Sequence, residues 1–336
     1  MMVAMGSGGR GDARRAASSY RRREKYLWFV LPAVVVIVAV IIFPWIFTVF
    51  MSLHDWQVAS PRTWVGLDNY ANLLGDERFR AAIGRTFIYT LLAVVFPVVI
   101  GTAAAILFHR EFPLRGFLRS IYILPMVATP VAIALVWTMM FHPQLGVLNY
   151  LLTRVGLPPS LWVYSPQTVI PSLVLVETWQ WTPLVMLIVL GGLATLPIEP
   201  LESAVVDGAG AWQILRDITL PLILPFIMVA VVLRTIDALK AFDTIFTITQ
   251  GGPGTASETI NIYLYLQAFS FFRIGHASAV VMVFFVIIVA CSLSLLVLRQ
   301  RMRWTYQLAP GHAVRRPHGP DGAGRPCAGS GSGWRS

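Results

Sequence analysis

Six long apolar runs constrain the fold of this chain more than any other feature. A helix rises about 1.5 Å per residue, so a span across a hydrocarbon core of about 30 Å needs about 20 apolar residues. Runs that meet this length lie at residues 27–53, 86–108, 120–141, 169–196, 220–242 and 274–298. Because 56% of the 336 residues are hydrophobic and only 12% are charged, the composition excludes an ordinary soluble domain. The sequence predicts an all-α polytopic membrane protein with six transmembrane helices.

The basic residues predict how these helices are oriented. Lys and Arg gather in the two tails and between the second and third runs, where a cytoplasmic segment is expected to carry them. Both tails are therefore predicted to be cytoplasmic, an N-in/C-in topology. The chain divides into a basic cytoplasmic tail (1–26), a transmembrane domain (27–302) and a Gly-, Pro-, Ser- and Arg-rich cytoplasmic tail (303–336) that is expected to be disordered. Since the positive charge follows the topology, membrane lipid is an expected partner and nucleic acid is not.

Residues 197–221 form a charged segment between the fourth and fifth runs, on the predicted cytoplasmic side. The segment carries Glu202 and has an Asp207-Gly208 turn signal near its middle. It is predicted to form two short helical pieces around a bend. Two interpretations are open at this point, an ordinary connecting loop or a docking surface for a partner.

Ionisable residues also occur inside two of the apolar runs. The fourth run holds Glu177, and the fifth holds Arg234, Asp237 and Lys240, followed by Asp243, alternating in sign every three residues. Such groups are costly in lipid and normally face the interior of a bundle or a water-filled path. They could neutralise one another along the helix, because residues three apart are neighbours on its surface. They could instead line a path for a polar solute, with Lys240 and Asp243 near the outer interface.

The second run contains Gly101 and Ala105, two small residues in a small-xxx-small pattern. Small side chains let helix backbones approach closely in a membrane. The pattern predicts a close helix contact rather than a chemical site.

The sequence contains no catalytic constellation. The glycine-rich GSGGRG near the N-terminus lacks the Lys and Ser or Thr of a phosphate-binding loop, and the histidines have no metal-ligand spacing. No cofactor or metal is expected. The chain is predicted not to be an enzyme and not to hydrolyse ATP by itself.

The charged segment resembles a known loop. The motif Glu202-Ser203-Ala204, then Gly208, then Ile218-Thr219-Leu220-Pro221 matches the spacing E-A-A-x3-G-x9-I-x-L-P of the EAA loop in binding-protein-dependent ABC importer permeases. Asp207-Gly208-Ala209 is similar to the D-G-A of that loop, and Ser203 is its one departure, a small residue in place of alanine. The outer segments 65–70 and 249–253 are similar to those of the carbohydrate branch, in the first of its two permease subunits.

This resemblance implies a type I importer-permease core with a cytoplasmic coupling helix in a bacterial plasma (inner) membrane. Its implied partners are a second permease subunit in a heterodimer, two ATP-binding cassette ATPase subunits and an extracytoplasmic solute-binding protein that delivers a sugar, polyol or glycerol phosphate. The residues it implies for ATPase coupling are Glu202, Ser203, Ala204, Asp207, Gly208, Ala209, Ile218, Leu220 and Pro221. The residues it implies for the substrate pathway are Glu177, Trp181, Arg234, Asp237 and Lys240.

In the implied coupling loop, Ala204, Ala209 and Ala211 are small enough for close approach of the ATPase. A secondary transporter and a non-transporting membrane scaffold are the alternative functions. Neither alternative requires the cytoplasmic EAA spacing.

Overall fold

The computed structural model describes residues 29–307, and their side chains as far as residue 297. The predicted basic tail at 1–26, and the predicted disordered tail beyond residue 307, lie outside the described residues. The first half of the chain forms η1 (Val38–Ile42), α2 (Phe43–Ser52), β1 (His54–Asp55), β2 (Thr63–Trp64), α3 (Asp68–Gly75), α4 (Glu77–His109), α5 (Arg115–Val127), α6 (Pro130–Met140) and α7 (Val147–Arg154). The second half forms η2 (Trp162–Tyr164), α8 (Val169–Leu193), α9 (Glu199–Val206), α10 (Ala211–Gln213), η3 (Ile214–Thr219), α11 (Leu220–Leu239), α12 (Asp243–Thr249), α13 (Ile260–Tyr265), η4 (Leu266–Ser270) and α14 (Ile274–Gln307).

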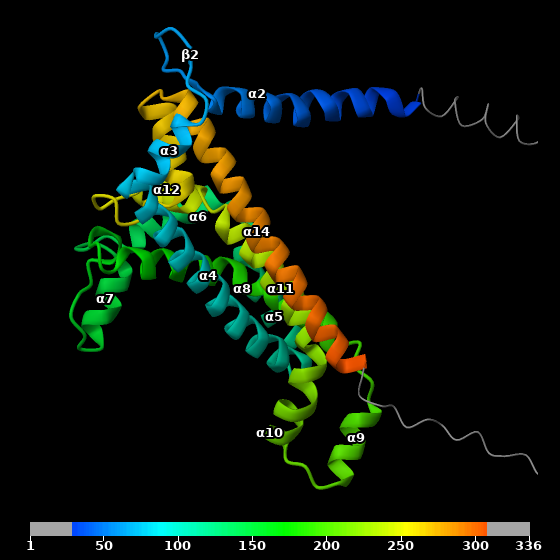
Figure 1. Ribbon diagram of the computed structural model, residues 1–336. Coiled ribbons are helices and arrows are strands. Elements are labelled where there is room, and N and C mark those ends of the chain that lie inside the picture. The colour runs from blue at the N-terminus through cyan, green and yellow to red at the C-terminus, as the bar shows by residue number, and fades with distance from the viewer. Residues whose placement is uncertain (1–28, 308–336) are drawn as a thin grey trace, which may run out of the picture.

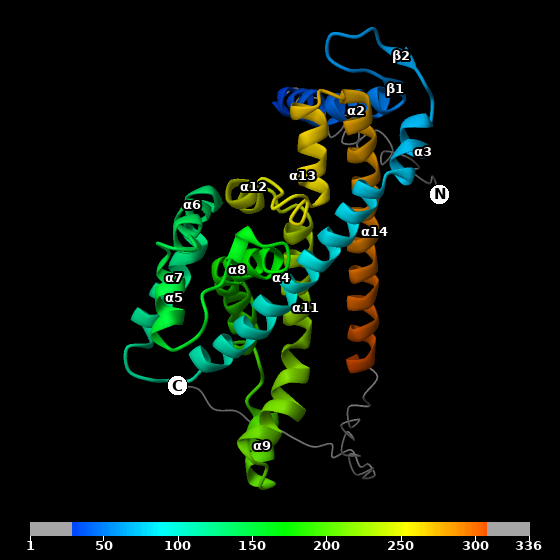
Figure 2. The same ribbon diagram turned by 90° about the vertical axis from the view of Figure 1, so that its left-hand side faces the viewer.

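Five helical stretches within the described residues are long and apolar enough to cross a membrane. They are Phe29–Ser52, Glu77–His109, Val169–Leu193, Ala211–Leu239 and Ile274–Val297. Each overlaps a predicted run, so the membrane-protein class and five of the six predicted helices agree with the structure. The longest of them lie side by side and give the molecule its elongated shape (Figure 1, Figure 2).

The third predicted span, residues 120–141, is not one straight helix. It consists of α5 and α6, which meet at a bend of 98°. The bend lies just before Pro130, whose ring disfavours helical backbone at the preceding residue. Thr129 accordingly has ψ 140° and Ala128 has ψ 147°, both extended. Hydropathy alone could not report this break, because the apolar run continues through it.

Helix boundaries also differ from the limits of the apolar runs. Helix α4 begins at Glu77 because Asp76 caps it, accepting from the backbone N–H groups of Arg78 and Phe79. Helix α14 continues to Gln307, past the predicted domain end at residue 302. Apolar runs mark the part of a helix that lies in lipid, whereas caps decide where the helix begins.

The core sits where α4, α8 and α11 pack together. A Cβ added at Gly101 on α4 would lie 2.7 Å from the Val185 Cβ and 2.9 Å from the Thr182 carbonyl oxygen of α8. Ala105, one turn further on, is fully buried beside Val185. The predicted close contact of Gly101 and Ala105 with another helix is confirmed, and the other helix is α8.

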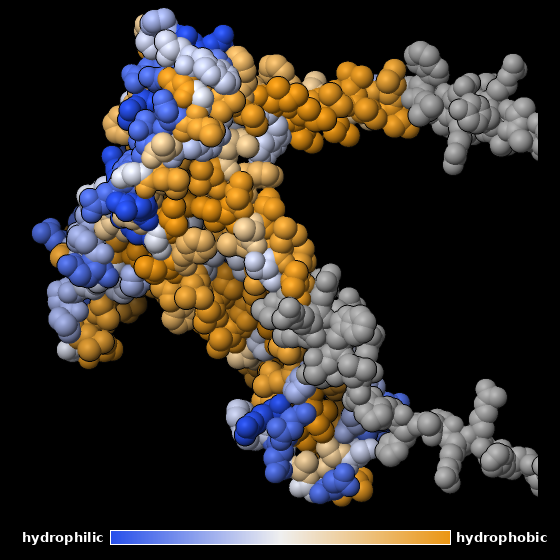
Figure 3. Space-filling view, viewed as in Figure 1, coloured by the Kyte–Doolittle hydropathy of each residue, from blue (hydrophilic) through white to orange (hydrophobic). Residues whose placement is uncertain are grey.

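The first apolar helix extends away from this core (Figure 1). Residues 29–47 are exposed throughout, and only the C-terminal end of the helix packs on α14, where the Trp45 and Phe285 rings are 4.4 Å apart. Its surface is almost wholly apolar (Figure 3).

Polar residues gather at two separate ends of the molecule (Figure 3). One end, here the α12 end, carries the short antiparallel hairpin β1–β2, α3, α7 and α12, with His54 opposite Trp64 in the hairpin. The other end carries α9 and α10. Between the two ends the surface is mainly apolar, as a membrane-spanning region requires.

A network of polar side chains fixes the α12 end. The Tyr263 hydroxyl donates to Asp76 Oδ2 at 2.6 Å and lies 3.0 Å from His276 Nε2. Arg78 holds the buried Glu258 carboxylate, with Nη2 to Oε2 at 2.8 Å. Burial raises the pKa of Asp76, but the hydrogen bonds from Tyr263 and from the backbone N–H groups of Arg78 and Phe79 outweigh it and leave this pKa below its usual value. Helices α4, α13 and α14 are thereby tied together.

Candidate functional site

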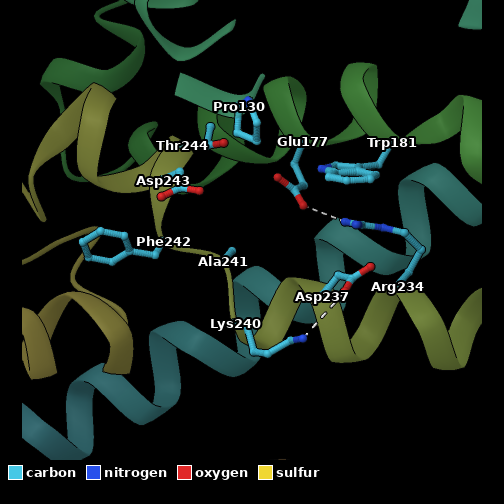
Figure 4. A pocket seen from close by; sticks show the side chains of 10 residues that line it. All are labelled: Pro130, Glu177, Trp181, Arg234, Asp237, Lys240, Ala241, Phe242, Asp243 and Thr244. Carbon is cyan, nitrogen blue, oxygen red and sulfur yellow. Dashed lines mark hydrogen bonds and ion pairs between the residues drawn. The ribbon is translucent and has the colours of Figure 1, made fainter. Parts of the chain in front are cut away.

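A cavity of about 310 Å³ lies between α8, α11, α12 and the start of α6. It gathers the ionisable residues of the fourth and fifth runs (Figure 4). We call it the charged cavity, and the residues that line it are Pro130, Glu177, Trp181, Arg234, Asp237, Lys240, Ala241, Phe242, Asp243 and Thr244. All five residues predicted for a substrate pathway are thus brought to one place, although they come from two helices.

The innermost part of the charged cavity is an ion pair between two helices. Arg234 Nη2 of α11 donates to Glu177 Oε1 of α8 at 2.6 Å, with side chains 0% and 5% exposed. The same nitrogen lies 3.4 Å from the carbonyl oxygen of Ala93 on α4, and the guanidinium lies 5.0 Å from the centre of the Trp181 ring. Three helices therefore meet at one cation.

This geometry corrects one interpretation of the charge pattern. Under one of the two open interpretations, neighbouring charges on the fifth run neutralise one another along their helix, but Arg234 pairs across to Glu177 rather than with Asp237. A fully buried guanidinium needs a short, desolvated carboxylate partner, and Glu177 provides one. Only the outer pair bridges along α11, with Lys240 Nζ at 3.9 Å from Asp237 Oδ1. Asp237 and Lys240 are about half-exposed, so water still solvates them.

Asp243 completes the charges of the cavity. It was expected near the outer interface, and it lines the charged cavity at the first turn of α12. A helix N-terminus favours a negative charge, which explains a carboxylate at this position. No ion-pair partner for Asp243 occurs among the described residues. The alternation of sign every three residues was the signal that could have placed Asp243 beside Asp237 and Lys240.

Several buried polar atoms on α4, α8 and α11 have no hydrogen-bond partner among the described residues. Within the described part of the chain, Arg234 Nε and Nη1, the Tyr89 hydroxyl and Gln180 Oε1 have no hydrogen-bond partner. Tyr89 on α4 is fully buried, and sequence reasoning missed it because a single tyrosine in an apolar run carries no signal. Arg234 lines the charged cavity, so its two unpartnered nitrogens are available to water or to the hydroxyl groups of a solute.

The second group of predicted residues forms an exposed helical hairpin at the far end of the molecule (Figure 1). The hairpin consists of α9, the turn at Gly208, α10 and η3, and it leads directly into α11. Gly208 has φ +79°, a left-handed conformation that glycine adopts without strain, so the predicted turn is confirmed. The Ala209 N–H donates to the Ala204 carbonyl oxygen at 2.9 Å and closes the end of α9.

The predicted coupling residues differ in their exposure. Glu202, Ser203, Asp207 and Gly208 are exposed, while Ala209, Ile218, Leu220 and Pro221 are half-buried. Ala204 is buried against its own chain, 7% exposed, rather than available for close approach of a partner. Large apolar side chains are instead exposed on the hairpin, with Val206 86% and Trp212 69% exposed.

The hairpin boundaries also differ from the prediction. Helix α9 runs from Glu199 to Val206, so it begins before Glu202, the first residue of the matched motif. The next helical stretch is continuous from Ala211 to Leu239, so Ile218, Leu220 and Pro221 belong to a long helix rather than to a loop.

The described residues contain no group of three or more His, Cys, Asp or Glu side chains that could hold a metal ion. The acidic residues of the charged cavity are Glu177, Asp237 and Asp243, and the first two are paired with cations. The site is suited to binding a polar solute through hydrogen bonds and an aromatic face.

Comparisons with known proteins agree on one family. The family of binding-protein-dependent transport system inner membrane components matches residues 97–304. A probable ABC transporter permease protein from Sinorhizobium fredii is 36% identical over 84% of this chain and 94% of its own length. A trehalose/maltose transport system permease protein from Thermococcus litoralis is 32% identical over 81% of this chain and 92% of its own.

The fold has a counterpart among solved structures. A chain of a bacterial ABC transporter involved in the import of the acidic polysaccharide alginate superposes with a TM-score of 0.75 at 24% identity, covering 85% of this chain and 99% of that one. The resemblance seen in the sequence is therefore confirmed, and neither a secondary transporter nor a non-transporting scaffold is favoured. The chain belongs to the family of inner membrane components of binding-protein-dependent transport systems and has the fold of an ABC importer permease.

Proposed function

We propose that this chain is the first of two different permease subunits in an ATP-driven carbohydrate importer of a bacterial inner membrane. An extracytoplasmic binding protein delivers the solute, and two ATPase subunits supply the energy. The names of relatives that carry trehalose and maltose support the carbohydrate class. In this arrangement both chain ends and the α9–α10 hairpin lie in the cytoplasm, and the α12 end faces outward.

One observation carries the proposal: a single helical stretch joins the hairpin to the charged cavity. Ala211–Leu239 has 29 residues and begins within the hairpin. At a rise of about 1.5 Å per residue, a stretch of this length spans about 40 Å. It carries Arg234 and Asp237 near its far end. A displacement of the hairpin by a partner ATPase would therefore move cavity-lining residues directly, as a rigid-body change does.

The coupling role rests on the exposed surface of the hairpin. Glu202 and Asp207 are exposed there beside the apolar Val206 and Trp212, which gives a partner both charge and apolar area. Interfaces of this kind are anchored by aromatic residues. We assign contact with the ATPase to this surface, and Ala204 to the internal packing that shapes it.

The substrate pathway is assigned to the charged cavity. Glu177, Asp237 and Lys240 offer acceptors and donors, and Trp181 offers an aromatic face against which the apolar face of a sugar ring can lie. A pathway between two permease subunits needs no tight binding, because the binding protein has already selected the solute.

Two matched glycines test the coupling role. Gly208 and Gly156 both have φ +79°, and an added Cβ would meet nothing within 4 Å at either position. Gly208→Trp and Gly156→Trp therefore carry the same backbone strain, but only Gly208 lies on the hairpin. We expect Gly208→Trp, and also Glu202→Lys, to insert into the membrane and to abolish ATP-driven uptake, while Gly156→Trp retains uptake. Normal uptake by a well-expressed Gly208→Trp variant would refute the coupling role.

A second experiment tests the pathway and the energy source. If Glu177→Ala and Asp237→Ala both leave the affinity and the rate of transport unchanged, the charged cavity is not the pathway. Uptake driven by a proton or sodium gradient in liposomes that hold this chain alone would establish a secondary transporter instead.

A further inference from the structure

We propose that the charged cavity disfavours anions, so that the solute of the importer is a neutral carbohydrate rather than an acidic one. The inference rests on the proposed function for the role of the cavity, but its physical content is the sign of the electric potential there. That sign follows from which of the charged side chains that line the cavity have a partner of opposite charge and which do not.

Both cations of the cavity have carboxylate partners within it. Arg234 is 0% exposed, donates to Glu177 at 2.6 Å and is covered by the Trp181 ring at 5.0 Å. An incoming carboxylate would have to displace Glu177, which is itself only 5% exposed. Lys240, the other cation, lies 3.9 Å from Asp237. Each cation among the lining residues therefore already has a carboxylate partner within the cavity, tightly for Arg234 and at a longer, half-exposed contact for Lys240.

One carboxylate remains without a cation. Asp243 lines the same cavity and has no ion-pair partner among the described residues. The formal charge of the lining side chains is thus negative, with three carboxylates against two cations. Figure 4 shows Asp243 beside Thr244, apart from Glu177 and Asp237, which both lie next to Arg234. An anionic group brought to within about 4 Å of one of these carboxylates is repelled by about 1 kcal/mol in water, and by more where water is excluded.

The chemistry of the lining favours hydroxyl groups. Carboxylates are acceptors only, and each hydroxyl of a neutral sugar is a donor that can bind them without introducing a like charge. A uronic acid would bring its own carboxylate among three others. The likeness to an importer of an acidic polysaccharide is one of fold at 24% identity, and it does not carry that solute over to this chain.

The potential can be measured without knowing the solute. We would place a single cysteine at Ala241 of the full-length chain, with Cys291 and Cys327 replaced by serine, within the purified importer. Its rates of reaction with a cationic ethylammonium and an anionic ethylsulfonate methanethiosulfonate are then compared. A cysteine at Leu145, which is 86% exposed, supplies the reference ratio. We expect the cationic reagent to be favoured at Ala241→Cys by about tenfold over the reference.

The source of the potential is tested by two matched substitutions in the Ala241→Cys background. Asp243→Asn should reduce the preference severalfold, whereas Asp68→Asn, an exposed acid on α3 outside the cavity, should leave it unchanged. A ratio equal to the reference, or a preference for the sulfonate, would overturn the inference, and so would an unchanged ratio in Asp243→Asn. Because the thiol reaction needs no transport, a failure here is distinct from a failure of the proposed function, which the uptake of the Gly208→Trp variant reports.

Discussion

Glu177 and Arg234 lie 57 positions apart in the sequence, and their side chains meet at 2.6 Å in the interior of the bundle. Both are almost inaccessible to solvent, with 5% and 0% of the side chain exposed. A pair of this kind gains little over apolar residues that fill the same space, but the loss of one partner leaves an unpaired buried charge. The pair therefore determines how α8 and α11 fit together.

The first prediction concerns the loss of one partner. We expect Glu177→Gln to lower the stability by about 3–5 kcal/mol, because the Arg234 guanidinium stays buried without a counter-charge. Asp237→Asn removes a carboxylate from the same cavity, but its pair with Lys240 is about half-exposed and is worth about 0–1 kcal/mol. Thermal unfolding of the two purified variants in detergent measures the difference.

A double substitution provides the control for this prediction. Replacing both residues, as in Glu177→Leu with Arg234→Met, removes the unpaired charge and should recover much of the stability lost in Glu177→Gln. Equal unfolding temperatures for Glu177→Gln and Asp237→Asn would show that the buried pair has no special role.

The second prediction concerns two glycines of α4. Gly101→Ala would force its Cβ to within 2.7 Å of Val185 and 2.9 Å of the Thr182 carbonyl, and overpacking of this kind typically costs about 1–3 kcal/mol. Gly84→Ala meets nothing within 4 Å on the same helix, so we expect it to be neutral or stabilising by about 0.5–1 kcal/mol. Unfolding temperatures that shift in the same direction would contradict the close contact of α4 with α8.

The third prediction is a pH dependence at the α12 end. Hydrogen bonds from Tyr263 and from the backbone N–H groups of Arg78 and Phe79 hold the pKa of Asp76 below its usual value, against the effect of burial. A carboxyl with a lowered folded-state pKa contributes stability above its unfolded pKa of about 3.9 and loses it as the pH falls through the folded pKa. We expect Asp76→Asn to be less stable than the original chain at pH 7, and this difference to shrink as the pH falls below about 4 and to vanish only below the lowered pKa of the folded state.

Thermal unfolding from pH 3 to pH 8 checks this dependence. Asparagine is also a good N-cap, so Asp76→Asn tests the charge rather than the cap of α4. Asp68→Asn at the start of α3 is the matched control and should leave the pH curve unchanged. A stability difference for Asp76→Asn that does not shrink between pH 5 and pH 3 would mean that the carboxylate charge is not its source.

How much the sequence could predict depends on the kind of interaction. The free energy of transfer into lipid is a property of composition, so five spans were located. Three agree with the observed helices within three residues at each end, whereas the helices that begin at Glu77 and Ala211 start nine residues before the predicted runs. The turn at Gly208 was predictable because Asp-Gly favours a left-handed residue locally. Hydropathy missed the bend before Pro130, although the effect of proline on the preceding residue was a usable local signal.

The sequence did not predict which side chains on different helices pair with one another. Arg234 has Asp237 three residues away, yet its partner is Glu177 on another helix. Nothing in the spacing shows that Arg234 is fully buried, and burial makes a short contact with a desolvated carboxylate necessary. The burial of Tyr89 likewise depends on which face of α4 packs against the core. Sequence reasoning named the segments that we propose for the pathway, and only the packing shows which of their charges have an ion-pair partner.

The last prediction follows from an asymmetry in the Arg78–Glu258 pair. Arg78 Nε lies 2.9 Å from Glu258 Oε1, and Arg78 Nη2 lies 2.8 Å from Oε2, which joins the start of α4 to the segment before α13. The glutamate side chain is 1% exposed and the arginine side chain is 39% exposed. Removal of the arginine strands a buried carboxylate, whereas removal of the carboxylate leaves an arginine that water can reach.

We therefore expect Arg78→Leu to cost about 2–4 kcal/mol and Glu258→Gln about 1–2 kcal/mol, measured by thermal unfolding in detergent. Arg80→Leu replaces an exposed arginine two positions further along the same helix and should change the stability by about 0.5 kcal/mol or less. In the double variant Arg78→Leu/Glu258→Leu the carboxylate is gone, so its loss should be smaller than the sum of the single losses. Equal losses for Arg78→Leu and Glu258→Gln would show that the difference in burial does not control the energy of this pair.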